Sequence, residues 1–237
     1  MTAGPRRVAV LDWDNSLHLG FTMGPWMHAL ARDAAETAVA DRFDRALADY
    51  EAGRMAYDAF ALLAEELYTG LMDGRLVADV EAVAERLVPV DPLRPGTSEL
   101  LAALHATGID PVLISGAPIE VLRAHAAAHA IASDDVTGWT LERDGDRYVG
   151  RLAGGNTARG GSKAQIVAAL VSQGAEIVLG VGDSPADAPL VDAARIGAWI
   201  DAVPTDESQR ATWTDARTGR VATGSLVDLA TAIATLD

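Results

Sequence analysis

The sequence predicts an α/β fold, in which a parallel β-sheet carries helices on both faces and an all-helical segment is inserted near the N-terminus. Three observations predict it. Residues 8–11 are a short apolar run rich in β-branched residues that ends at a polar cluster, as a central parallel strand does. Residues 21–90 repeat Ala, Leu and acidic residues at three- and four-residue spacing, which indicates helices. From residue 97 onward, strand and helix patterns alternate, which is typical of βαβ units.

The helical segment is expected to contain three or four helices. Its interruptions are glycines, at Gly53, Gly70 and Gly74. A joint rich in Pro and Gly follows at residues 89–96. We therefore expect two domains, with residues 1–19 and 92–237 in the α/β core and residues 20–91 in the inserted helical domain.

Strands and helices are expected to alternate after the joint. The predicted helices cover residues 97–106, 118–130, 163–173, 188–194 and 226–236, and the predicted strands cover residues 111–114, 176–181 and 196–200. Between residues 136 and 152, an Asp-Gly turn separates two runs of mixed polarity, which predicts an antiparallel hairpin. Residues 205–224 have weak periodicity, and no element is predicted there.

The composition limits the classes of function. The chain has 237 residues, of which 49% are hydrophobic, so it can bury a core. A net charge of −15 argues against a general binder of nucleic acid or anionic membranes, because these polyanions repel an acidic surface. The absence of Cys excludes disulfides, thiolate catalysis and Cys-ligated metals. The segment of residues 1–7 is short and polar, so we expect a cytoplasmic protein without a membrane span. We expect this protein to be either a monomer or a homodimer.

Four polar clusters each follow a predicted strand or begin a helix. They are Asp12 with Asp14, Ser115 with Gly116, Lys163, and Asp183 with Asp187. In a parallel α/β sheet such positions meet at the carboxyl edge, where ligands bind. Two carboxylates one residue apart, as in Asp12 and Asp14, can serve as nucleophile and as acid and base, although such pairs more often form turns or helix caps. Ser115 and Gly116 at a helix start can bind an anion or can simply cap the helix.

Lys163 is the only lysine among 19 basic residues. It opens a predicted helix, where its charge faces the positive end of the helix dipole, so we expect an anionic ligand or a carboxylate beside it. Asp183 and Asp187 follow a strand four residues apart. They suit a hard cation such as magnesium, although capping of the next helix explains them equally well.

Together, these motifs resemble the haloacid dehalogenase-like (HAD) superfamily of phosphohydrolases, and within it subfamily IB, which contains the phosphoserine phosphatases. The matching segments are LDWDNS, LISGAP, GGSK preceded by DGDRYVGRLAGGN, and GVGDSPAD. The resemblance extends from about residue 8 to residue 200. It implies a Rossmann-like core, an inserted helical cap of the C1 type, and magnesium-dependent hydrolysis of a small phosphate monoester.

The resemblance also implies roles for the matching carboxylates. Asp12 would attack phosphorus and become an aspartyl phosphate, while Asp14 would protonate the leaving oxygen and then activate water. Magnesium would be held by Asp12, by the backbone carbonyl of Asp14 and by Asp183, with Asp187 in support. The phosphoryl oxygens would be bound by Ser115, Gly116 and Lys163.

Substrate choice is expected to depend on side chains near the first motif and in the cap, namely Trp13, His18, Phe21 and Arg54. Phe21 stands where phosphoserine phosphatases carry a Glu for the substrate ammonium, and Ala186 stands where they carry an Asn. These differences argue against phosphoserine. The mixture of aromatic residues with few acidic ones near the first motif and in the cap favours an uncharged or acidic leaving group. Two alternatives stay open: a HAD-fold module that binds or senses a phosphorylated ligand without turning it over, and a phosphomutase.

Overall fold

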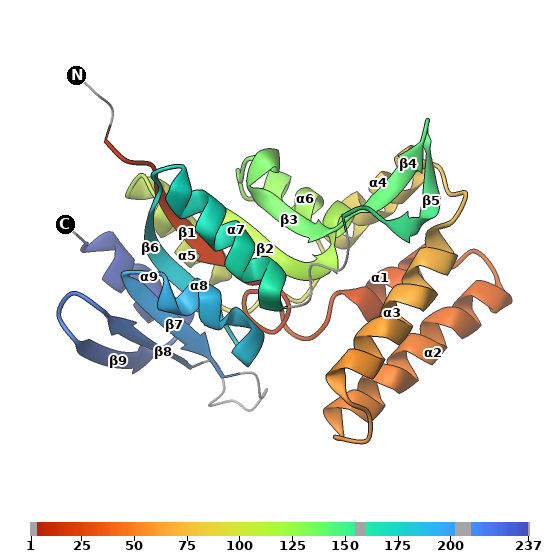
Figure 1. Ribbon diagram of the computed structural model, residues 1–237, viewed down its shortest axis with the longest axis horizontal. Coiled ribbons are helices and arrows are strands. Elements are labelled where there is room, and N and C mark those ends of the chain that lie inside the picture. Colours follow the sequence, from red (N-terminus) through yellow and green to blue (C-terminus); the bar gives the residue numbers. More distant parts are fainter. Residues whose placement is uncertain (1–3, 155–159, 202–209, 237) are drawn as a thin grey trace.

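The structure, a computed structural model, describes residues 4–154, 160–201 and 210–236. Its main feature is a seven-stranded sheet with the strand order β3-β2-β1-β6-β7-β8-β9 (Figure 1). The parallel strands are β1 (Arg7–Leu11), β2 (Asp110–Pro118), β3 (Val136–Trp139), β6 (Glu176–Gly182) and β7 (Ile196–Ile200). Two antiparallel strands, β8 (Ala211–Asp215) and β9 (Arg220–Gly224), extend the sheet beyond β7. The predicted α/β fold is confirmed.

Helices cover both faces of the sheet. They are α5 (Thr97–Ala106), α6 (Ile119–Ala128), α7 (Gly160–Ser172), α8 (Ala188–Asp192) and α9 (Leu226–Ala234). Successive residues of β1 point to opposite faces. Ala9 and Leu11 belong to a hydrophobic cluster with α5, α6 and α9, whereas Val8 and Val10 belong to a cluster with α7 and α8. Strand β1 is therefore buried on both sides, as its unbroken apolar run predicts.

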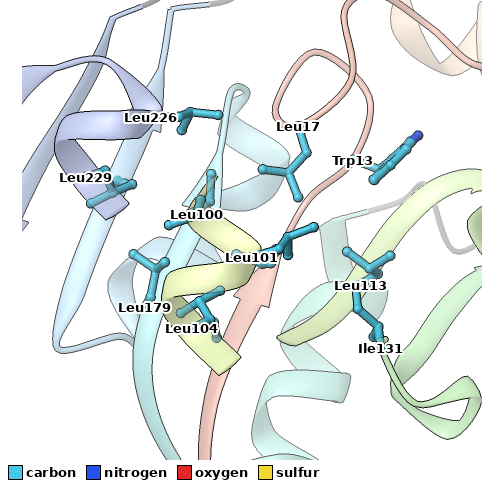
Figure 2. Packing of buried hydrophobic residues seen from close by; sticks show 14 of the residues in the cluster. Trp13, Leu17, Leu100, Leu101, Leu104, Leu113, Ile131, Leu179, Leu226 and Leu229 are labelled. Atoms are coloured by element: carbon cyan, nitrogen blue, oxygen red, sulfur yellow. The ribbon is translucent and has the colours of Figure 1, made fainter. Parts of the chain in front are cut away.

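Helices α5 and α9 pack together on one face of the sheet. Figure 2 shows their leucines in one cluster, with Leu100, Leu101 and Leu104 from α5 and Leu226 and Leu229 from α9. Gly96, which precedes α5, has a φ of 92°, and a Cβ at this position would lie 2.8 Å from the Leu226 Cβ and 2.8 Å from the Val227 nitrogen. Glycine is thus required here both for the left-handed backbone and for the close approach of α9.

Four helices occupy the predicted helical segment: α1 (Met23–Leu30), α2 (Ala34–Glu51), α3 (Tyr57–Met72) and α4 (Val77–Leu87). We call them the helical block; they lie beside the sheet in Figure 1, in orange and yellow. Their apolar side chains form a separate hydrophobic cluster that also includes residues of α6, of β3 and of a hairpin made of β4 (Leu141–Asp144) and β5 (Arg147–Leu152). The predicted hairpin therefore forms and packs on the helical block. No helix within the described ranges is long and apolar enough to cross a membrane.

Arg75 joins three helices of the block. Its buried guanidinium donates hydrogen bonds to the Leu30 carbonyl (2.7 Å), the Leu71 carbonyl (2.6 Å) and the Glu36 carboxylate (2.7 Å). Arg75→Met removes the charged donor from three acceptors. We expect it to lower the free energy of unfolding, measured by urea titration, by about 2 kcal/mol.

Arg42→Met is the matched control for this variant. Arg42 has an exposed side chain and makes a 3.8 Å ion pair with Glu66. Since such pairs contribute little, we expect a change of less than about 0.5 kcal/mol. Equal effects of the two substitutions would contradict the structural role of Arg75.

Two parts of the sheet differ from the sequence prediction. Strand β2 is longer than predicted and continues through Pro118, because that end of the strand pairs with Trp139 of β3. Strands β8 and β9 lie in a segment where no element was predicted. Only Ala211 and Trp213 of β8 are buried, and β9 is largely exposed, so the apolar alternation is weak. Residues 205–209 of that segment lie outside the described residues.

Candidate active site

The strand register brings three of the four motifs to one edge of the sheet. Leu11 of β1 pairs with Leu113 of β2 and with Val181 of β6. The motif residues that follow within two positions therefore leave the sheet at its carboxyl edge: Asp12, Ser115 and Asp183. In Figure 1 this end of β1 points toward the helical block. Strand β1 lies between β2 and β6, so the chain continues from β1 to one side of the sheet and later crosses to the other side. The carboxyl edge at such a switch point is the usual position of a ligand in these sheets.

Lys163, in the first turn of α7, lies between two carboxylates. Its Nζ is 2.7 Å from Asp12 Oδ1 and also donates to Asp187 Oδ1. Only 4% of Lys163 is exposed, and a buried ammonium needs such partners. Burial alone would lower the pKa of Lys163, but the charges of Asp12 and Asp187 raise it above its ordinary value. Two carboxylates, those of Asp12 and Asp187, thus lie beside this lysine, where an anionic ligand or one carboxylate was expected.

Asp187 has a structural role in addition to its contact with Lys163. Its Oδ2 accepts hydrogen bonds from the Ser184 N–H (3.0 Å) and the Ser184 hydroxyl (2.8 Å), which form a capping box at the short 3₁₀ turn of residues 185–187. A Cβ on Gly182 would lie 2.1 Å from the Asp187 Cβ. The second glycine of the GVGDSPAD motif is therefore required for Asp187 to approach the strand. This geometry confirms the capping role of Asp187, and its role at a cation site stays a prediction.

Asp12, Asp183 and Asp187 form a group that can hold a cation. Each offers one oxygen, and these oxygens lie within 4.8 Å of one another. The hydroxyl of Ser16 lies 3.2 Å from Asp12 Oδ2 and 3.3 Å from Asp183 Oδ1, so these two oxygens converge. Burial, followed by the charge of Asp187, raises the pKa of Asp183 to about 6. Burial also raises the pKa of Asp12, with Lys163 opposing the shift. An all-oxygen donor set crowded with buried negative charge suits magnesium.

Asp14 is held by Thr22 at one of its carboxylate oxygens. Its Oδ1 accepts hydrogen bonds from the Thr22 N–H (2.9 Å) and from the Thr22 hydroxyl (2.5 Å). Burial raises the pKa of Asp14, and the bonds from Thr22 oppose the shift. A carboxyl group whose pKa is raised is suited to carry a proton to a leaving group.

Ser115 and Gly116 lie in the extended end of β2. Ser115 is buried, and its hydroxyl accepts a hydrogen bond from the Ala117 N–H at 3.2 Å. Helix α6 begins at Ile119 with Pro118 as its N-cap residue and no side-chain cap. Ser115 is therefore not the helix cap that its sequence context allows, and it stays beside the strand end where Asp12 emerges.

The four predicted specificity residues lie in different environments. Trp13 is fully buried, with its ring 4.6 Å from that of His125. His18 is buried as well, and its Nδ1 lies 3.0 Å from the Gly20 carbonyl oxygen. Both side chains therefore belong to the packing beneath the Asp12 loop.

Arg54 and Phe21 are more accessible. Arg54 is 63% exposed at the side chain and forms a surface ion pair with Asp49. Phe21 is partly exposed, directly precedes Thr22, and makes an edge-on contact with Phe60 at 6.3 Å. Of the four, Phe21 has the position best suited to meet a substrate.

Sequence reasoning missed Arg94 and Thr22. Arg94 is buried and donates to the carbonyl oxygens of Ser16 (2.8 Å) and Asn15 (2.6 Å), and so supports the loop after Asp12. Asn15 has a φ of 58°, which makes this loop a tight left-handed turn. The sequence holds no clear signal for either residue, because each is an ordinary polar residue whose partner is set by the fold.

The sequence model of one protein family, HAD or haloacid dehalogenase-like hydrolase, matches residues 9–192. The chain belongs to this family. The resemblance inferred from the four motifs is thereby confirmed for the larger part of the chain. No curated protein matches the sequence.

Solved structures share the fold of this HAD hydrolase. A protein of unknown function from Bordetella pertussis Tohama I gives a TM-score of 0.62 at 22% identity, over 80% of this chain and 87% of that one. A phospho-aspartyl intermediate analogue of phosphoserine phosphatase gives a TM-score of 0.57 at 15% identity, over 80% of this chain and 84% of that one. A HAD family hydrolase from Salmonella enterica subsp. enterica serovar Typhi gives 0.56 at 18% identity, over 81% of this chain and 60% of that one. Identities this low establish the fold alone.

Proposed function

We propose that this HAD hydrolase is a magnesium-dependent phosphomonoesterase that acts on a small phosphorylated metabolite through an aspartyl phosphate. The position of Asp12 carries the proposal. One of its carboxylate oxygens is bonded to Lys163, and the other faces the oxygen of Asp183 across the Ser16 hydroxyl. A carboxylate held in this way at the end of a buried strand is oriented for attack on a ligand at the sheet edge.

Two displacements complete the reaction. First, Asp12 forms a bond to phosphorus while the bond from phosphorus to the ester oxygen breaks, and Asp14 gives its proton to that oxygen. Then Asp14 takes a proton from the water that attacks phosphorus, and phosphate leaves Asp12. Lys163, with Ser115 and the Gly116 N–H, binds the phosphoryl oxygens and balances their charge in both steps.

The donor set fits magnesium, as its convergent buried oxygens indicate. Asp12, Asp183 and the backbone carbonyl of Asp14 would hold the ion, and Asp187 would support them through the loop and Lys163. When bound, magnesium would neutralise the charge of the phosphate and of the nucleophile as the two approach.

An aromatic cluster beside Asp14 supports an uncharged leaving group. Phe21 contacts Phe60, Phe60 stacks on Tyr50 at 5.2 Å, and Tyr50 lies 5.7 Å from Tyr57. Tyr57 is 38% exposed. Burial, followed by the neighbouring Tyr50, raises the pKa of Tyr57. None of these four side chains carries a carboxylate that could form an ion pair with the ammonium of phosphoserine, whereas all can contact an apolar or neutral group.

Phosphate release from a panel of metabolite phosphates and a generic aryl phosphate tests the function. We expect magnesium-dependent release, faster for neutral and aromatic esters than for phosphoserine. The absence of magnesium-dependent turnover on every ester tested would overturn the proposal.

Removal of magnesium is expected to lower thermal stability as well as activity. At a free concentration 100 times its Kd, a ligand of the folded state adds about 2.7 kcal/mol, which corresponds to several degrees in Tm for a chain of this size. Differential scanning fluorimetry with and without chelator measures the change. An unchanged Tm at neutral pH would contradict a preformed metal site.

The same experiment has a predicted pH dependence. Without magnesium, the pKa of Asp183 is raised from 3.8 to about 6, chiefly by burial, so the folded state holds a proton that the unfolded state has lost. The stability associated with this group is therefore complete below pH 3.8 and is lost as the pH rises through about 6. Magnesium should raise Tm more at neutral pH than at acidic pH, where protons compete for the same oxygens.

A further inference from the structure

The hydrogen bonds of Asp14 lead to the first residue of the helical block. Thr22 directly precedes α1, and both its N–H and its hydroxyl donate to Asp14 Oδ1, at 2.9 and 2.5 Å. The indole N–H of Trp13 donates to the Thr22 hydroxyl oxygen at 3.1 Å. No hydrogen bond from the described residues reaches Asp14 Oδ2. One carboxylate oxygen of Asp14 is thus held by two donors, and the other is left for a ligand.

The direction of the Thr22 hydroxyl proton follows from these contacts. A hydroxyl has one proton, and the Trp13 N–H can only donate, so it occupies an acceptor position of the Thr22 oxygen. The proton of Thr22 therefore points to Asp14 Oδ1. Both Thr22 and Trp13 are buried, and Trp13 is fixed by its contact with the His125 ring. The hydrogen bond between the Trp13 N–H and the Thr22 hydroxyl is consequently shielded from water.

Helix capping does not account for the Thr22 side chain. Thr22 is the residue before α1, but its hydroxyl makes no capping bond to that helix, and its backbone is already helical with φ −65° and ψ −32°. Instead, the Thr22 N–H, which lies at the positive end of α1 where backbone N–H groups lack partners within the helix, donates to the Asp14 carboxylate. The side chain of Thr22 is directed to the candidate acid and base.

We infer that Thr22, supported by the Trp13 N–H, is a positioning residue for Asp14, and that it orients Asp14 Oδ2 toward the leaving-group oxygen. The inference rests on the proposed hydrolase function. In the first displacement the bond from Asp12 to phosphorus forms, the ester bond breaks with its electron pair going to the leaving oxygen, and that oxygen takes the Asp14 proton. A misplaced Asp14 should therefore slow the first displacement most for esters with basic leaving groups, since these groups cannot depart without a proton.

The test compares two substrates on the same protein sample: 4-nitrophenyl phosphate, whose leaving group needs little protonation, and a simple alkyl phosphate, whose leaving group needs a full proton. The measured quantity is the ratio of their kcat/KM values, because kcat/KM reports the first displacement. The ratio cancels any difference in the folded fraction, so a poorly folded variant still gives a valid result.

Thr22→Val keeps the shape of the side chain and removes the hydroxyl. We expect kcat/KM for the alkyl ester to fall by about 10²-fold or more, and that for 4-nitrophenyl phosphate by a much smaller factor. Thr22→Ser, which keeps both donors, should restore the wild-type ratio. Trp13→Phe, which removes only the indole N–H, should shift the ratio in the same direction by a smaller amount.

Thr97→Val is the matched control. Thr97 is also buried, and its hydroxyl donates to the Leu17 carbonyl at 2.9 Å, so this variant removes a threonine hydrogen bond from the same loop without touching Asp14. Its ratio should equal that of the wild type. If Thr22→Val lowers kcat/KM equally for both esters, or for neither, the inference is overturned while the hydrolase function stands. A wild-type protein that hydrolyses neither ester would instead overturn the proposed function, and the inference with it.

Discussion

Asp12→Asn is expected to lower phosphate release by about 10⁴-fold or more, because the variant loses the nucleophile of a covalent mechanism and keeps only binding and electrostatic contributions. Asn has nearly the same shape as Asp, so the loop and the pocket should stay in place. The amide nitrogen cannot displace an ester oxygen from phosphorus. Steady-state phosphate release at saturating magnesium measures the effect, with circular dichroism and gel filtration as checks of folding.

Asp134→Asn is the control for this substitution. Asp134 is exposed on the short turn before β3, away from the carboxyl edge of β1, so the same chemical change should leave turnover at the wild-type rate. Turnover by Asp12→Asn at a rate near that of the wild type would contradict covalent catalysis at this residue. It would leave a direct attack of water on phosphorus as the simplest mechanism.

Lys163→Met is expected to damage both stability and activity. The ammonium of Lys163 is bonded to Asp12 and Asp187, and all three side chains are buried. Removing one partner of a buried ion pair leaves uncompensated charge, which typically costs about 3–5 kcal/mol. Activity should fall by about 10³-fold, comparable with the loss of a strong electrostatic contact in the transition state. Urea unfolding without magnesium and phosphate release with magnesium measure the two effects.

Lys163→Arg separates charge from shape. The guanidinium keeps the positive charge but is broad and planar, whereas the present site holds a compact ammonium between two carboxylates. We expect this variant to recover much of the lost stability and little of the activity. Recovery of full activity by Arg would show that charge alone suffices, and it would contradict the specific contact that we assign to the ammonium.

The same lysine shows how far the sequence predicts the site. Its position at a helix start, unfavourable for the dipole, predicts a nearby anion, and two carboxylates are found there. The strand ends that carry Asp12 and Asp183 are also predictable, since unbroken apolar runs mark central parallel strands. These inferences depend on local pattern and on a general rule about sheet edges.

Other contacts could not be predicted because they depend on how separate segments meet. Arg94 supports the loop of Asn15 and Ser16 from nearly eighty residues away, and its own neighbourhood in the sequence suggests only a joint. Thr22 meets Asp14 because the chain reverses at a left-handed turn and then begins α1. Strands β8 and β9 escaped prediction because only two residues of β8 and none of β9 are buried, which leaves a weak alternating pattern.

The most direct test of the central claim is to look for the phosphoryl group on Asp12. Wild-type protein is mixed with a phosphate ester and magnesium, quenched in acid within one turnover, and digested with pepsin in the same acid, because an acyl phosphate hydrolyses at the alkaline pH that trypsin needs. Fragmentation between Asp12 and Asp14 in the peptides that contain both residues locates the modification. We predict a phosphoryl group on Asp12 that depends on magnesium and is absent from Asp12→Asn. Phosphate release by the wild type with no phosphorylated peptide at any quench time, or with the group on another residue, would contradict it.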